Sequence, residues 1–200
     1  MNSLAKRLLP VLAMLIASGA NRNAIAEMPQ LSDDGWHTWR VTAAENAADW
    51  CCFQWNSGIS KRKSCDLDNQ QNGYSRSDDL VVNIGEMQIY ALTSGGELKK
   101  IRALNSQCRV KAKSEIIDLG FLETDDSVDW LQQYIDPPTQ ISTNVMAAIS
   151  THHGERPINV LMDVVRSNSS MENRKDALFW LAMSESDQAY EFLDRMLSKN

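Results

Sequence analysis

The segment DWCCFQW, residues 49 to 55, places two adjacent cysteines between two tryptophans. Such a pair could be a reactive dithiol, or it could anchor structural disulfides. Cys51 and Cys52 lack the C-x-x-C spacing at a helix N-terminus that lowers a thiol pKa, and no βαβ pattern surrounds them. We therefore interpret the pair as structural, with a redox site as the alternative.

The chain has four cysteines, Cys51, Cys52, Cys65 and Cys108. An even count suits disulfide pairing in an exported protein. Adjacent cysteines rarely bridge each other, because the resulting ring strains the peptide between them. Each member of the pair should then bond to one of the other two cysteines, and both arrangements stay open. We favour Cys52 with Cys65 and Cys51 with Cys108.

Two adjacent histidines, His152 and His153, follow a predicted helix. With Glu155 or Asp163 they are candidates for a metal site, but adjacent side chains point in different directions and the H-x-x-x-H spacing is absent. The partial negative charge at a helix C-terminus favours a protonated imidazole. We therefore interpret these histidines as part of a helix C-cap, and we expect no metal or other cofactor.

A second metal-like pattern, DLDNQQNGYSRS, starts at Asp66. Its twelfth position is Ser77, where a calcium loop needs a bidentate glutamate, and its glycine stands at the eighth position instead of the sixth. No nucleophile elbow, phosphate-binding glycine loop or zinc-protease motif occurs either. The remaining histidine, His37, has no serine or cysteine that the sequence places beside it. We favour a non-catalytic protein.

Four tryptophans, Trp36, Trp39, Trp50 and Trp55, precede the basic run at residues 61–63. They could form a binding face for an acidic or carbohydrate partner. Packing around the disulfides is the interpretation we favour, because small secreted cores rely on large aromatic residues. Two tryptophans exposed on one face would reverse this choice.

The first 26 residues have the order of a secretory signal peptide: basic residues, a short apolar run, then small residues ending at Ala26. A cut after Ala20 is the alternative. Removing them takes three of the 20 basic residues and none of the 26 acidic ones, which leaves a net charge of about −9. We expect a periplasmic or secreted protein without a membrane span. The charge argues against nucleic acid or an anionic membrane as the partner.

Residues 27–125 carry the pattern of a β-rich part. Alternating residues on both sides of Gly95 and Gly96 predict a β-hairpin at about 87–104, and GWHTWRV predicts an earlier strand in which Trp36 and Trp39 lie on opposite faces. The mostly polar stretch from 56 to 79 predicts a long exposed loop.

Residues 126–200 carry apolar residues three and four apart, which predicts helices. The first should span about 127–135, with Asp126 or Ser127 as its N-cap. Four more are expected at 140–151, 156–166, 171–183 and 187–199.

The last four helices repeat with a shift of 32 residues, which places Val145 on Ala177, Ile149 on Leu181, and three later apolar residues (Ile158, Leu161, Val165) on Tyr190, Leu193 and Leu197. The segment at 172–197 resembles a HEAT-like repeat of the kind common in bacterial proteins, although it has Asn173 where a valine usually stands. Residues 140–167 match more loosely, with Pro157 in place of the usual alanine. The resemblance implies an α-solenoid and an interaction surface, and it implies no ligand.

Together these patterns predict an α+β protein in which a disulfide-bonded β-rich part packs on a short solenoid of two HEAT-like helix pairs. The expected function is binding to another protein, of the bacterial envelope, through the helical face. An enzyme or metal-dependent site at the junction of the two parts is the alternative.

Overall fold

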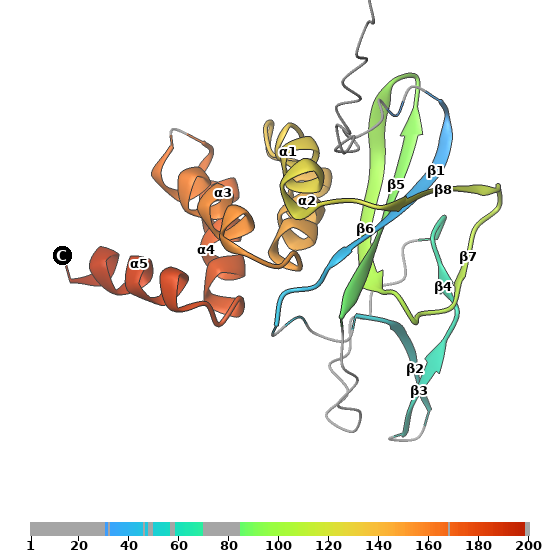
Figure 1. Ribbon diagram of the computed structural model, residues 1–200, viewed down its shortest axis with the longest axis horizontal. Helices are drawn as coiled ribbons and strands as arrows, with labels where there is room; N and C mark the ends of the chain where they lie inside the picture. The colour runs from blue at the N-terminus through green and yellow to red at the C-terminus, as the bar shows by residue number, and fades with distance from the viewer. Residues whose placement is uncertain are drawn as a thin grey trace, which may run out of the picture.

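Figure 1 shows the computed structural model of the chain, which describes residues 31, 33–45, 47, 50–56, 59–69, 85–167 and 169–198. The side chains of 54–56 and 59–61 are not included in this description. The predicted signal peptide lies outside the described residues. The described part is mixed α+β, as expected.

A four-stranded sheet forms the centre of the β-rich part, in the order β6-β5-β1-β8. Strands β5 (Glu86–Ser94) and β6 (Glu97–Asn105) form the predicted hairpin, and the two glycines of its turn, Gly95 and Gly96, have φ angles of 61° and 76°. Such angles are unfavourable for residues with a Cβ atom. Strand β1 (Gly35–Thr42), also predicted, runs antiparallel to β5 and parallel to β8 (Ile116–Phe121).

A smaller group of strands carries the cysteines. Strands β2 (Cys52–Asn56) and β3 (Ile59–Lys63) form an antiparallel ribbon, and β4 (Cys65–Asp66) pairs with β7 (Val110–Lys111) in parallel. The prediction of a loop from 56 onward was therefore wrong for residues 59–66. A strand in a two-stranded ribbon can be polar along its whole length, because neither face has to be buried. Strand β3 therefore lacks the apolar alternation by which strands are recognised. Residues 70–84 lie outside the described part.

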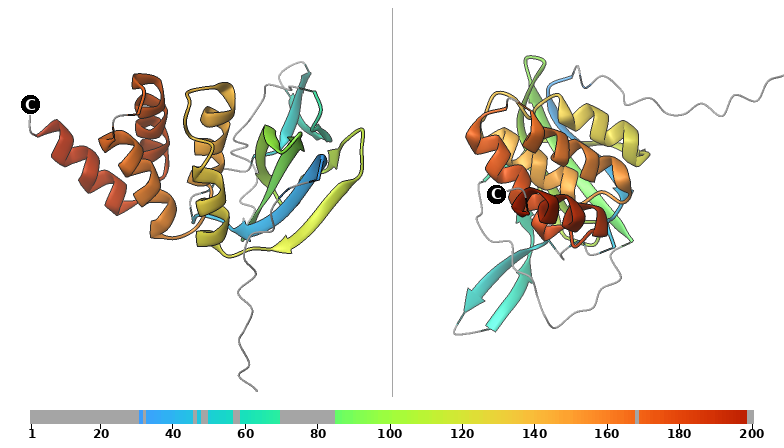
Figure 2. Two further views of the ribbon diagram at one scale, coloured as in Figure 1. Left: turned by 90° about the horizontal axis from the view of Figure 1, so that it is seen from above. Right: turned by 90° about the vertical axis from the view of Figure 1, so that its left-hand side faces the viewer.

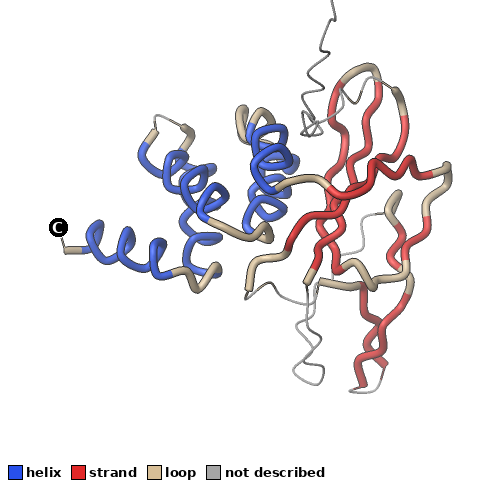
Figure 3. The backbone as a smooth tube through the Cα atoms, viewed as in Figure 1, coloured by secondary structure: helices blue, strands red, loops and turns tan. Residues whose placement is uncertain are grey.

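Five helices follow the sheet: α1 (Thr124–Gln132), α2 (Gln140–Ser150), α3 (Glu155–Arg166), α4 (Met171–Met183) and α5 (Asp187–Leu197). Figure 3 shows them on one side of the strands. The last four agree with the predicted segments to within two residues. The first was placed wrongly: it starts after Glu123, and Ser127 lies in its second turn instead of capping it. Within the described ranges, no helix has the length and apolarity needed to cross a bilayer.

The sheet buries both of its faces. One face, with Trp39, packs against the helices in a single apolar core that extends as far as Phe192. The other face, with Trp36, packs against Cys52 and Cys65 in a second core. In Figure 2, the helices stack in successive layers away from the sheet. Helix α2 lies between the sheet and α4, in contact with β6 on one side and α4 on the other.

Candidate functional site

The cysteines form two disulfides, Cys51–Cys108 and Cys52–Cys65, with Cα atoms 5.5 and 5.2 Å apart. This is the pairing that we favoured from the sequence. No free cysteine is found among the described residues. Cys51 and Cys52 are both buried, so the pair holds two chain segments to one point. The geometry is that of structural disulfides.

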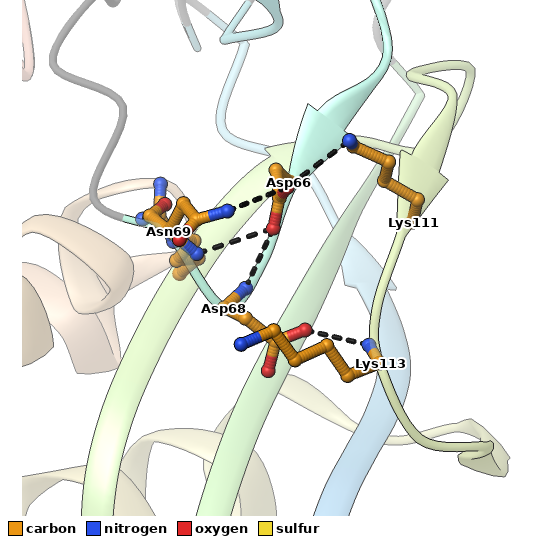
Figure 4. Close-up of polar contacts among 6 residues, drawn as sticks. Asp66, Asp68, Asn69, Lys111 and Lys113 are labelled. Atoms are coloured by element: carbon orange, nitrogen blue, oxygen red, sulfur yellow. Dashed lines mark hydrogen bonds and ion pairs between the residues drawn. The ribbon is translucent and has the colours of Figure 1, made fainter.

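The candidate calcium loop begins with a turn whose carboxylates already have hydrogen-bond donors (Figure 4). One Asp66 oxygen accepts the backbone N–H groups of Asp68 and Asn69 at 3.2 and 3.1 Å. The other accepts the Asn69 amide at 2.8 Å and lies 3.1 Å from the Lys111 ammonium. Asn69 and, after it, Lys111 lower the pKa of the Asp66 carboxyl to about 2. Asp68 accepts the Lys113 N–H at 2.6 Å. These contacts close the turn without a cation.

Trp36 and Trp39 pack in the core, the interpretation that we favoured over an exposed binding face. Both are fully buried, on opposite sides of the sheet as predicted. The Trp36 indole N–H donates to Asp68 at 3.1 Å. Trp50 is half-buried and contacts Trp180 of α4, with ring centroids 5.5 Å apart. These three tryptophans pack inside the fold, and the Trp55 side chain lies outside the described residues.

The junction of the sheet and the helices contains a serine–histidine pair that sequence reasoning missed. Ser127 Oγ lies 2.8 Å from His152 Nε2, and it accepts the Trp39 indole N–H at 2.8 Å. His152 Nδ1 lies 2.9 Å from the carbonyl oxygen of Ala148. Since a carbonyl only accepts, Nδ1 carries the proton and Nε2 accepts from the serine. A continuous chain of hydrogen bonds therefore runs from Trp39 to the last turn of α2.

The serine–histidine distance is that of a nucleophile and its base. However, Ser127 is 0 % and His152 is 2 % exposed, so a substrate has no access to either side chain. Burial lowers the pKa of His152 to about 4. The expected capping contact with α2 is present, but the imidazole is neutral at pH 7, so the assumption of a protonated histidine was wrong. We interpret this pair as structural.

His153 points the other way and is exposed, while its N–H donates to the Thr42 carbonyl at 3.0 Å. The two histidines therefore do not come together. Across the described part of the chain, no three histidine, cysteine, aspartate or glutamate side chains cluster as a metal site would require.

Large apolar side chains are exposed on α4 (Phe179 and Met183) and, to a greater extent, on the outer side of α5. With the 32-residue shift, Ile158 and Val165 of α3 correspond to Tyr190 and Leu197 of α5. The two α3 residues are buried, with 6 % and 8 % exposure, whereas the two α5 residues are 73 % and 77 % exposed. Because they are seven residues apart, Tyr190 and Leu197 lie on one side of the helix.

We call this surface the end face and define it as Tyr190, Asp194 and Leu197. Asp194 stands where α3 has the buried Met162. Asp187 and Glu191 are also exposed on α5. Residues 123–200 contain 13 acidic and six basic residues, so their net charge of −7 is more negative than the −6 of the full chain. The end face therefore combines two exposed apolar side chains with Asp194, and Glu191 beside it pairs with Arg195.

Known proteins provide no further guide. The chain matches no family model, no curated protein and no solved structure. The sequence pattern marked Tyr190 and Leu197 as apolar helix positions, but only the structure shows that nothing among the described residues covers them.

Proposed function

We propose that this chain is an exported protein of the bacterial envelope, periplasmic or secreted, that binds another protein through the end face. The signal-like N-terminus and the two disulfides support an oxidising compartment, where such bonds persist. The acidic end face supports a protein partner over nucleic acid.

In this proposal, helices α2 to α5 are two HEAT-like pairs. The inward positions support it, because Val145 and Ala177 are both fully buried, and so are Ile149 and Leu181 at the equivalent register. In a solenoid each pair covers its neighbour, and the terminal pair needs a polar outer surface. On α5 the exposed Tyr190 and Leu197 depart from such a polar surface, although Asp194 lies between them.

The observation that carries the proposal is the exposure of Tyr190 and Leu197. The equivalent side chains of α3, Ile158 and Val165, are buried in the core, and α3 contacts both α4 and α5. Tyr190 and Leu197 offer the same kind of side chains to a further helix. Burying such side chains contributes about 1.5–3 kcal/mol each.

The charge of the end face determines the partner's chemistry. Glu191 pairs with Arg195 of the same helix at 3.5 Å, which leaves Asp187 and Asp194 beside the apolar stripe. This arrangement is complementary to an amphipathic helix with lysine or arginine at its border. We therefore expect the partner to present an apolar helix face with a basic border.

Site-specific photocrosslinking tests this. A photoreactive phenylalanine derivative replaces Tyr190 in the full chain, and the matched control replaces Phe121, an aromatic residue of β8 that is 42 % exposed. Irradiation of the envelope fraction should give a covalent product at position 190 and none at 121. The crosslinked partner peptide should contain basic residues beside apolar ones.

A second variant, Leu197→Ser, should reduce the crosslink at position 190 about tenfold or more, because it removes one buried contact of about 2 kcal/mol. Equal products at 190 and 121 would contradict the proposal. So would an acidic partner peptide, or a product made only of two copies of this chain.

A further inference from the structure

A cavity of about 450 Å³ lies in the β-rich part, beside the Cys51–Cys108 disulfide. Residues 62–64 of β3 and its continuation line one side, and residues 107–109, between β6 and β7, line the other. Small-molecule sites in proteins typically have volumes of about 300–1,000 Å³. This cavity is thus large enough for a small ligand.

The charge of the cavity is opposite to that of the chain as a whole. Arg62, Lys63 and Arg109 line it, and the described lining contains no aspartate or glutamate. Asp66 of β4 and Asp68 of the following turn bond to Lys111 and to the Lys113 N–H. Arg62 already has an interaction of its own. Lys63 and Arg109 repel each other, and an anion placed between them relieves the repulsion.

The cavity walls are held in place by covalent and backbone bonds. Cys108, in one wall, is tied to Cys51, and Cys65, next to the other wall, is tied to Cys52. The Cys65 N–H donates to the Arg109 carbonyl at 2.7 Å, which joins the two walls directly. A site fixed before binding loses little entropy when it takes a ligand.

We propose that this cavity binds a small molecule bearing carboxylate or phosphate oxygens. Arginine presents a planar fork of donors that matches either group, and lysine adds a point charge. Ser64 and Gln107 supply neutral donors for the remaining ligand oxygens. The site is separate from the end face and does not depend on it.

The test is calorimetric titration of the oxidised full chain with citrate in one arm and inorganic phosphate in the other. We expect saturable binding of at least one probe, and the tighter probe identifies a polycarboxylate or a phosphate as the ligand class. Arg109→Gln and Lys63→Gln should each weaken binding about tenfold, the effect of one lost charge-assisted hydrogen bond.

The matched control is Lys99→Gln, which removes an exposed lysine from β6 outside the cavity lining. Its affinity should equal that of the unaltered chain. The proposal would be overturned if neither probe showed saturable binding at concentrations up to about 10 mM, where even very weak binding is detectable. Equal weakening by Lys99→Gln and Arg109→Gln would also overturn it, because it would indicate general charge attraction instead of a site.

Discussion

The buried His152 should make this protein sensitive to acid between pH 6.5 and pH 4. Its imidazole has an ordinary pKa of 6.5 in the unfolded chain, and burial lowers the pKa to about 4 in the folded one. Between these values, the unfolded state binds a proton that the folded state does not. The folding free energy contributed by the neutral imidazole is thus fully present above pH 6.5 and is lost as the pH falls towards 4.

The size of this effect follows from the two pKa values. Lowering the pH from 7 to 4 should remove ~3 kcal/mol of unfolding free energy through His152 alone, which is a large part of the stability of a typical domain. Urea unfolding, followed by tryptophan fluorescence at several pH values, measures the total change. His152→Gln removes the titration, and His153→Gln, at the exposed neighbour, is the matched control.

Between pH 7 and pH 4, His152→Gln should lose ~3 kcal/mol less unfolding free energy than the unaltered chain. His153→Gln should lose the same amount as the unaltered chain. Carboxylates also titrate in this range, but they contribute equally to all three proteins. Parallel stability curves for the unaltered chain and His152→Gln would refute the reasoning. A measured pKa near 6.5 for His152, from NMR of the imidazole, would refute it independently.

Two further changes test the other buried contacts. Ser127→Ala leaves one buried donor and one buried acceptor without a partner, so it should lower the unfolding free energy by about 2–4 kcal/mol; a loss below 1 kcal/mol by urea unfolding would contradict the hydrogen-bond chain. Replacing Cys51 and Cys108 by alanine should cost ~4 kcal/mol, and replacing Cys52 and Cys65 ~3 kcal/mol, because the sequence separations are 57 and 13 residues. Thermal unfolding of the two double variants should show this order, and the reverse order would contradict it.

The parts of the fold that follow from local pattern were predictable. The hairpin of β5 and β6 has alternating residues and two glycines at its turn, and α2 to α5 have regular apolar spacing with clear breaks between them. Helix α1 was misplaced because Ser127, a good N-cap residue, is used by Trp39 and His152 from distant parts of the chain. Hydrogen bonds to residues that are distant in the sequence cannot be recognised from the local sequence pattern.

Strand β8 was not predicted as a separate element for a related reason. It is a short edge strand with Asp118 in the middle and Ile117 and Phe121 partly exposed, so it lacks the alternation of a half-buried strand. Its pairing partner is β1, more than 70 residues earlier in the chain.

The candidate sites were less accessible to sequence reasoning than the fold. Tyr190 and Leu197 have the same apolar character as Ile158 and Val165, and only the position of α5 at the end of the stack distinguishes them. The cavity combines residues 62–64 with 107–109, which the disulfides bring together. The basic run at 61–63 is visible in the sequence, but nothing in the sequence indicates that Arg109 lines the same cavity.

The position of α2 affects how binding at one end of the molecule would change the stability of the other end. Because α2 packs on the sheet and on α4 at once, one apolar core extends from Trp39 of β1 to Phe192 of α5. A partner that bound α5 only in the folded state would raise the free energy of every opening that disrupts this core. Occupancy at the end face should therefore slow amide exchange in β1, on the far side of α2 from the partner.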